Sequence, residues 1–266
     1  MSKNAVRNSR RTKVELGAEK PTPKKRFMEA VAEIETMEQS AVPKFVPAST
    51  RQKEALAMLR EGRSVVFLTG SAGTGKSMLA AYHSATVLKT KKIDKVFLIR
   101  PAVATGKSIG LLPGTIEEKM APYFAQTVAH LSTYLGEGFL RYCLEKKTIE
   151  MKPVEYMRGT SFESCIVIAE ECQNFTEEEF EMLLTRIGKN CTLILTGDQK
   201  QHDMRGVSGL EKTLQLLEEV QSKQPEYLSD EDLDEMEKNI GIVVFKPEDV
   251  VRSGITRAFV KMYHNN

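Results

Sequence analysis

The sequence predicts an α/β fold in which a mainly parallel sheet is flanked by helices and preceded by a disordered basic N-terminal arm. Two observations support this prediction. Residues 70–77 read Gly-Ser-Ala-Gly-Thr-Gly-Lys-Ser, a complete G-x-x-x-x-G-K-[ST] phosphate-binding loop, or Walker A motif. Short apolar runs also recur along the chain between helix-favouring stretches. This alternation is typical of strands that are buried on both faces of a parallel sheet.

The N-terminal segment is strongly basic. Residues 1–26 hold nine Lys or Arg against two Glu, whereas the remainder holds 29 basic and 34 acidic side chains. We predict a basic arm and linker over residues 1–47 and one folded domain over residues 48–266. Such an arm suits electrostatic contact with nucleic acid, and a solvated tail that binds nothing is the alternative.

The predicted elements follow in order from apolar runs and turn residues. A short helix over 26–39 leads into an extended, proline-containing linker at 42–47. The strand that enters the phosphate-binding loop is expected at 64–69, and good helix formers follow the loop. Further strands are expected at residues 95–100, 164–170, 192–196 and 240–245.

Three features set the remaining elements. Thr176 and Glu179 match a capping box at the start of a helix. Residues 224–240 are predicted to be an acidic insertion, with a helix capped by Ser229, because residues 226–237 contain seven acidic and no basic side chains. Pro247 is expected in the first turn of a terminal helix that runs to about residue 263.

Cysteine usage and hydropathy bear on the compartment. The four cysteines lack C-x-x-C spacing, which indicates neither a zinc site nor a disulfide framework; they are Cys143, Cys165, Cys172 and Cys191. No apolar run approaches the ~18 residues that a membrane span needs, and the N-terminus lacks the apolar core of a signal peptide. The sequence therefore predicts a cytoplasmic protein without a membrane partner.

The phosphate-binding loop predicts a nucleoside triphosphate site. Its glycines let backbone N–H groups surround the phosphates, and the following helix N-terminus adds partial positive charge. Lys76 places an ammonium group against the β and γ oxygens, and Ser77 offers a hydroxyl to Mg²⁺. A glycine-rich turn without a ligand is the alternative. The residues expected to hold the nucleotide are Gly70, Ser71, Ala72, Gly73, Thr74, Gly75, Lys76 and Ser77.

The apolar run before residue 170 ends in two carboxylates, as an NTPase needs beside its phosphate-binding loop. Glu170 is expected to organise Mg²⁺ with Ser77, and Glu171 to polarise the attacking water. A helix-leading acidic cluster is the structural alternative. The usual pair is Asp-Glu, so Glu170 carries its carboxylate one methylene further. We expect Glu170→Asp to raise turnover, unless the strand has adapted to Glu and Asp slows the reaction.

A second strand end carries a candidate sensor. Residues 197–201 read Gly-Asp-Gln-Lys-Gln, directly after the predicted strand at 192–196. Ligands of open α/β sheets lie at the carboxyl ends of the strands, so Gln201 is expected to hydrogen-bond the γ-phosphate or the lytic water. A plain strand-terminating turn is the alternative.

Several further runs resemble one family. They are Arg100-Pro101-Ala102-Val103-Ala104-Thr105-Gly106, Gly110-Leu111-Leu112-Pro113-Gly114, Glu117-Glu118-Lys119-Met120, Pro122-Tyr123, Tyr156-Met157-Arg158-Gly159, Glu170-Glu171-Cys172-Gln173-Asn174, Thr185-Arg186-Ile187-Gly188 and Thr196-Gly197-Asp198. Together they resemble the PhoH family of P-loop ATPases over residues 48–220, and more weakly over 241–263. The chain looks like the compact kind without an attached nuclease or RNA-binding domain, similar to versions carried by bacteriophages.

The resemblance implies a RecA-like core related to superfamily 1 helicases, with ATP and Mg²⁺ as cofactors. It also implies hexameric rings and a role with RNA or single-stranded nucleic acid, in the host cytoplasm if the chain is phage-encoded. Gln52 matches the adenine-reading glutamine of related helicases, or else it is an ordinary polar helix residue. The candidates for an arginine that reaches a neighbour's γ-phosphate are Arg158, Arg205 and Arg252, each of which has a plain surface role as its alternative.

Three functions compete at this point. The first is a Mg²⁺-dependent ATPase ring, with helicase-like action on nucleic acid. The second is a nucleotide-gated RNA-binding or scaffolding ring that turns over slowly. The third, a small-molecule P-loop kinase, is disfavoured because the paired carboxylates and the G-D-x-x-Q run favour water as the acceptor. A nuclease site has no local support, since the acidic run at 226–237 is typical of a solvated face.

Overall fold

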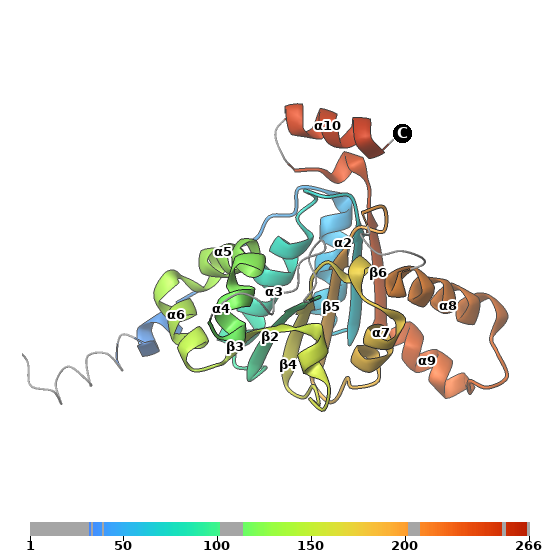
Figure 1. The fold of residues 1–266 in the computed structure, drawn as a ribbon, viewed down its shortest axis with the longest axis horizontal. Coiled ribbons are helices and arrows are strands. Elements are labelled where there is room, and N and C mark those ends of the chain that lie inside the picture. The colour runs from blue at the N-terminus through green and yellow to red at the C-terminus, as the bar shows by residue number, and fades with distance from the viewer. Residues whose placement is uncertain are drawn as a thin grey trace, which may run out of the picture.

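The computed structural model describes residues 32, 34–38, 40–101, 114–201, 208–251 and 254–264. Its centre is one six-stranded sheet with the order β3-β2-β4-β5-β1-β6, in which every neighbouring pair is parallel. Helices cover the sheet (Figure 1). The fold is therefore the predicted P-loop, RecA-like α/β arrangement. The strands are β1 Val65–Gly70, β2 Lys95–Arg100, β3 Ile149–Pro153, β4 Cys165–Ala169, β5 Cys191–Gly197 and β6 Ile240–Phe245.

The helices connect these strands as the parallel order requires. The α-helices are α2 Thr50–Arg60, α3 Lys76–Lys89, α4 Ile116–Met120, α5 Ala125–Leu135, α6 Glu137–Glu145, α7 Glu177–Leu184, α8 Gly209–Lys223, α9 Asp230–Asn239 and α10 Gly254–His264. Short 3₁₀ turns are η2 Ala121–Phe124, η3 Val154–Met157, η4 Cys172–Asn174 and η5 Pro247–Asp249. In the predicted helix over 26–39, residues 32 and 34–38 are helical, and the basic arm lies outside the described residues.

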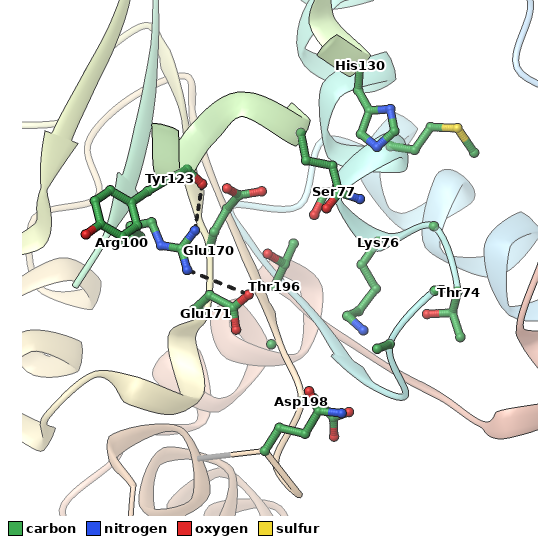
Figure 2. A pocket seen from close by; sticks show the side chains of 17 residues that line it. Thr74, Lys76, Ser77, Arg100, Tyr123, His130, Glu170, Glu171, Thr196 and Asp198 are labelled. Atoms are coloured by element: carbon green, nitrogen blue, oxygen red, sulfur yellow. Dashed lines mark hydrogen bonds and ion pairs between the residues drawn. The ribbon is translucent and has the colours of Figure 1, made fainter. Parts of the chain in front are cut away.

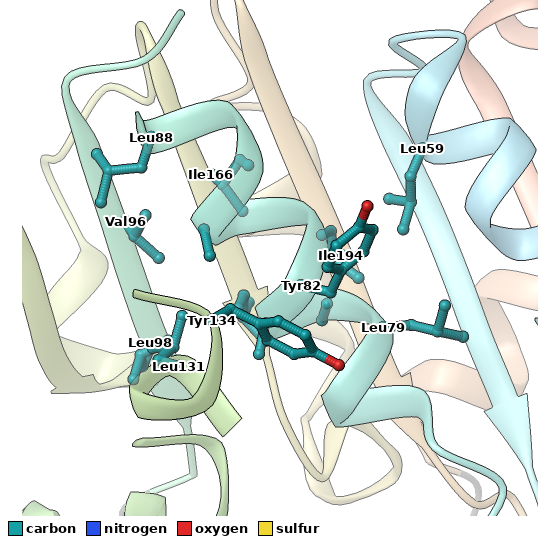
Figure 3. Close-up of a cluster of buried hydrophobic side chains, with 14 of the residues drawn as sticks. Leu59, Leu79, Tyr82, Leu88, Val96, Leu98, Leu131, Tyr134, Ile166 and Ile194 are labelled. Atoms are coloured by element: carbon teal, nitrogen blue, oxygen red, sulfur yellow. The ribbon is translucent and has the colours of Figure 1, made fainter. Parts of the chain in front are cut away.

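Two apolar layers hold the sheet, one on each face. Val66 and Leu68 of β1 point to the layer shared with α2, α3, α5 and α6, while Val65 and Phe67 point to the layer shared with α7 and α8. Figure 3 shows the first layer, where Tyr82 meets Tyr134 edge to face with ring centroids 5.1 Å apart. Burial on both faces explains why the strands read as continuous apolar runs. Phe45, in the predicted linker, also packs in the first layer, against Tyr82.

One strand, β3, was not predicted from the sequence. β3 reads Ile-Glu-Met-Lys-Pro and lies at the edge of the sheet, paired only with β2 among the described strands. Its two charged side chains take part in surface ion pairs: Glu150 contacts Lys95 at 2.6 Å and Lys152 at 2.7 Å. An edge position tolerates such charges, so β3 lacks the apolar run that identifies the central strands.

The prediction for Pro247 was wrong. Pro247 opens the 3₁₀ turn η5, and the terminal helix α10 begins only at Gly254. Two contacts hold the segment between Pro247 and α10 outside a continuous helix. Buried Asp249 forms an ion pair with Arg51 at 3.0 Å, and Val251 N donates to the carbonyl of Gly73 at 3.1 Å.

Both predicted helix caps are present. Thr176 Oγ1 accepts from Glu179 N at 3.2 Å, and the Glu179 carboxylate accepts from Thr176 N at 2.8 Å. Ser229 caps α9 in the same way, with Asp232 as its partner, so the acidic run carries an ordered helix. None of the helices within the described ranges has the length and apolar character that a membrane span requires.

Candidate functional site

A cavity opens at the carboxyl ends of β1, β4 and β5, which lie next to one another in the sheet (Figure 2). This is the edge at which open parallel sheets bind ligands. The cavity brings together predicted residues from three separate chain segments, namely 72–77, Glu170 with Glu171, and Gln201. It also contains residues to which the sequence analysis assigned no individual role, which are Met78, Arg100, Tyr123, Gln126, His130, Thr196, Gly197 and Asp198.

The loop between β1 and α3 has the backbone conformation that its glycines allow. Gly70, Gly73 and Gly75 have φ values of 103°, 75° and 86°. A side chain at Gly70 would also overlap the carbonyl oxygen of Phe245 at the end of β6. The loop is therefore formed only because glycine stands at these positions.

Lys76 lies at the mouth of this loop. Its Nζ donates to the carbonyl oxygens of Gly70 at 2.5 Å and Ser71 at 2.8 Å. Burial lowers the pKa of Lys76, while Asp198 and Glu171 act to raise it. A partly desolvated ammonium group between loop carbonyls and carboxylates is suited to exchange these contacts for phosphate oxygens, which carry more negative charge.

Gln52 lies directly beneath the loop. Its side chain is 1% exposed, donates from Nε2 to the carbonyl of Thr74 at 2.8 Å and accepts at Oε1 from Ala48 N at 2.7 Å. Gln52 is not among the residues that line the cavity. The contacts thus show a brace for the loop, and a role in reading adenine stays a prediction.

Glu170 follows β4 and is buried beside the loop serine. Its carboxylate accepts a hydrogen bond from the hydroxyl of Thr127, on α5, and lines the same cavity as Ser77. Burial raises the pKa of Glu170, and the hydroxyls of Thr127 and Ser77 together with Arg100 oppose that rise. A carboxylate and a hydroxyl that line one cavity at the loop offer the oxygen donors that Mg²⁺ prefers when phosphates and waters complete its shell. These residues therefore fit the predicted metal.

Glu171 is held in an unusual backbone conformation. Its φ of 51° and ψ of 39° lie in the left-handed region, which costs free energy for a residue other than glycine. Gln173 Nε2 donates to Glu171 Oε2 at 2.6 Å, and Arg100 Nη2 lies 3.8 Å from Glu171 Oε1. Arg100 is itself fixed by a 2.6 Å hydrogen bond from Nη1 to the carbonyl of Tyr123 (Figure 2). The carboxylate of Glu171 therefore has a defined place at the cavity.

Gln173 also connects the segments that follow β4 and β5. In addition to its hydrogen bond to Glu171, its Oε1 accepts from Asp198 N at 3.1 Å and its Nε2 donates to the carbonyl of Gln201 at 3.3 Å. Gln201 is thus positioned at the cavity through its backbone. Asp198 and Arg100 stand in motif runs noted in the sequence, but their roles at the cavity were not predicted; the available signal is that Arg100 ends β2 and Asp198 directly follows β5.

Of the three arginine candidates, only Arg158 lies within the described residues, and it does not line this cavity. Arg158 follows η3, is exposed and lies near Glu178 on α7. Arg205 and Arg252 lie outside the described residues. An exposed position leaves Arg158 available to a neighbouring molecule.

The contacts of Glu170 reverse the expectation for Glu170→Asp. The shorter side chain withdraws its carboxylate from Thr127, which is fully buried, and leaves that hydroxyl without an acceptor. We therefore expect turnover to fall about 10-fold, the equivalent of one charged hydrogen bond. Steady-state hydrolysis over a Mg²⁺ titration measures it.

Thr127→Val provides the matched control, because it removes the same hydrogen bond and keeps Glu170 in place. Both variants are expected to lose turnover to a similar extent. Faster hydrolysis by Glu170→Asp would show that the reach to Thr127 does not matter for the site.

Comparison with known proteins places this geometry in context. A family model described as "PhoH-like protein" matches residues 44–264. Protein PhoH of Escherichia coli strain K12 is 38% identical over 223 residues, covering 82% of this chain and 58% of that protein. A PhoH-like protein of Bacillus subtilis strain 168 is 39% identical over 171 residues, covering 64% of this chain and 53% of its own. The chain thus spans little more than half the length of these relatives.

Solved structures with similar folds are more distant. The large terminase of bacteriophage HK97 aligns with a TM-score of 0.46 at 12% identity, covering 89% of this chain and 52% of that chain. The Pif1 helicase from Candida albicans aligns with a TM-score of 0.40 at 16% identity, covering 83% of this chain and 44% of that chain.

Proposed function

The chain belongs to the PhoH-like protein family, and on that premise we propose that it is a cytoplasmic Mg²⁺-dependent ATPase that assembles as a hexameric ring and acts on RNA or single-stranded nucleic acid. One observation carries the catalytic part of this proposal. Lys76, Ser77, Glu170 and the fixed carboxylate of Glu171 all line one cavity.

Each group has a distinct role in the proposed reaction. The backbone N–H groups of the loop and Lys76 would bind the β and γ phosphates of ATP, while Ser77 and Glu170 would hold Mg²⁺. The bound Mg²⁺ would neutralise part of the phosphate charge. Glu171 orients and polarises the attacking water.

The remaining predicted residues complete the site. Gln201 contacts the γ-phosphate and reports its presence. Gln52 supports the loop and reads adenine. An arginine from the neighbouring subunit reaches the γ-phosphate, with Arg158, Arg205 and Arg252 as candidates, an arrangement that contributes about 10³ to 10⁵ in rate where it has been measured.

The nucleic-acid part of the proposal rests on the charge of the arm. Residues 1–26 carry nine basic and two acidic side chains. Removing them is expected to weaken RNA affinity and to flatten its salt dependence, because each phosphate that the arm neutralises on a single strand adds roughly 0.7 to the log–log slope. Binding of a single-stranded RNA oligonucleotide at several salt concentrations measures both effects.

Turnover of the truncated protein serves as the control, because the ATP site lies in the folded domain and its RNA-independent hydrolysis should survive. An identical salt slope with and without the arm would exclude residues 1–26 as a binding element.

Turnover of the full chain with and without RNA tests the function as a whole. We expect single-stranded RNA to stimulate hydrolysis. Slow turnover that RNA does not change, together with an assembly mass that shifts on ATP addition, would favour the nucleotide-gated scaffolding ring instead.

A further inference from the structure

The terminal helix α10 presents an apolar face to solvent. Ile255, Phe259 and Met262 are 66%, 52% and 48% exposed. Their spacing of four and three residues places them on one side of the helix. Figure 1 shows α10 standing clear of the sheet, beyond the carboxyl end of β6. Three large apolar side chains in a row on a protruding helix indicate a surface that is covered in the assembled protein.

An apolar groove lies elsewhere on the same chain. It runs between α8, α9 and the edge strand β6, and from here on we call it the α8–α9 groove. Its apolar lining consists of Leu217, Val220, Leu233, Met236, Ile240 and Ile242. The groove therefore offers the kind of apolar seat that an amphipathic helix fills.

Charge distinguishes this groove from two others on the described surface. Its lining holds one charged residue, Glu237, and the surrounding α8–α9 segment, residues 209–239, holds ten acidic and three basic side chains. A second groove, before and along α2, is bordered by Lys44, Lys53 and Arg60. A third, over α5 and α6, is bordered by one charge of each sign, Glu137 and Arg141.

The sequence of α10 contains Arg257 and Lys261 and no acidic residue. A basic helix is repelled by the basic groove, gains little at the mixed one and is attracted by the acidic one. Charge complementarity thus favours the α8–α9 groove as the seat of α10.

The positions of the two surfaces indicate a contact between molecules. The groove lies toward the amino end of β6, where Ile240 and Ile242 line it, whereas α10 follows the carboxyl end. The segment between them is tied down by the contacts of Asp249 with Arg51 and of Val251 with Gly73. In the structure α10 and the groove of its own chain therefore lie at opposite ends of β6.

We propose that α10 of one copy docks in the α8–α9 groove of the next copy, with Phe259 at the centre of the contact. The two surfaces differ, so the contact is head-to-tail, and repetition of such a contact closes a ring when the rotation permits. This inference rests on the proposed ring assembly and assigns the surfaces that build it.

The test uses two full-length variants and native mass measurement. Phe259→Asp damages the helix and spares the groove, while Met236→Lys damages the groove and spares the helix. Each variant alone is expected to raise the dissociation constant of assembly by at least about 100-fold, as removal of a central anchor does. Mixed in equal amounts, they should form a 1:1 heterodimer, because one intact helix meets one intact groove and the complex cannot grow.

Val46→Asp is the matched control, since Val46 is 74% exposed and lies on neither surface. It should assemble as the parent does, and unchanged thermal melting should confirm that all three variants fold. If the parent protein assembles and both variants assemble equally well, or if the mixture stays monomeric, the docking proposal is overturned while the proposed ring assembly stands. A monomeric parent protein overturns both the docking proposal and the ring assembly.

Discussion

Replacing Lys76 with alanine is expected to weaken ATP binding by about 10²- to 10⁴-fold and to abolish hydrolysis. Lys76 is the lysine at the mouth of the loop, and its Nζ already contacts two loop carbonyls. Charge-assisted hydrogen bonds contribute about 1.5 to 3 kcal/mol each, and the substitution would remove one such bond from each of the β and γ phosphates. Titration of a fluorescent ATP analogue into the purified protein measures the decrease in affinity.

Lys53→Ala is the control for charge removal, because Lys53 is exposed on α2 and does not line the cavity. Its ATP affinity should match that of the parent protein. Unchanged affinity in Lys76→Ala would show that the nucleotide binds elsewhere and would remove the basis for the proposed function.

Glu171→Gln should bind ATP as the parent does and hydrolyse it about 10²- to 10⁴-fold more slowly, the range over which a positioned acid or base contributes. The amide keeps the shape of the side chain and an oxygen that can accept from Gln173, so the local structure should survive. What it loses is the negative charge that polarises water. Single-turnover hydrolysis, measured beside equilibrium binding, separates the two effects.

Glu145→Gln makes the same chemical change at an exposed position on α6 and should leave both constants unaltered. If Glu171→Gln hydrolyses ATP at the rate of the parent protein, another group at the cavity orients the water. Asp198, which lines the same cavity, would then be the next candidate.

The central strands were predictable because burial on both faces forces continuous apolar sequence. β2 and β6 match the predicted bounds, and β1, β4 and β5 differ from them by one residue at each end. The order of the chain also placed the ends of β1, β4 and β5 at one edge, since parallel strands share a direction. This is why residues as far apart as Lys76 and Glu171 could be assigned to one site without coordinates.

Other parts of the site have no local pattern in the sequence. Thr127 lies in the first turn of α5 and contacts Glu170, which is 43 residues further along the chain. Gln173 joins two strand ends only because η4 turns its side chain between them. Such contacts depend on tertiary packing, so neither residue type nor spacing reveals them. The same holds for the exposed face of α10, which is visible only once the rest of the core is accounted for.

The end of β6 has a consequence for communication within an assembly. Ser71 N donates to the carbonyl of Phe245 at 3.2 Å, and Val251 N donates to the carbonyl of Gly73 at 3.1 Å, so the chain leading to α10 is bonded twice to the phosphate-binding loop. Any rearrangement of the loop on ATP binding acts on the segment from which α10 departs. Energetic coupling of this kind is reciprocal by thermodynamic necessity. If a neighbouring subunit binds α10, that contact changes the ATP affinity of the subunit to which α10 belongs. ATP binding then changes the affinity between the two subunits by the same factor.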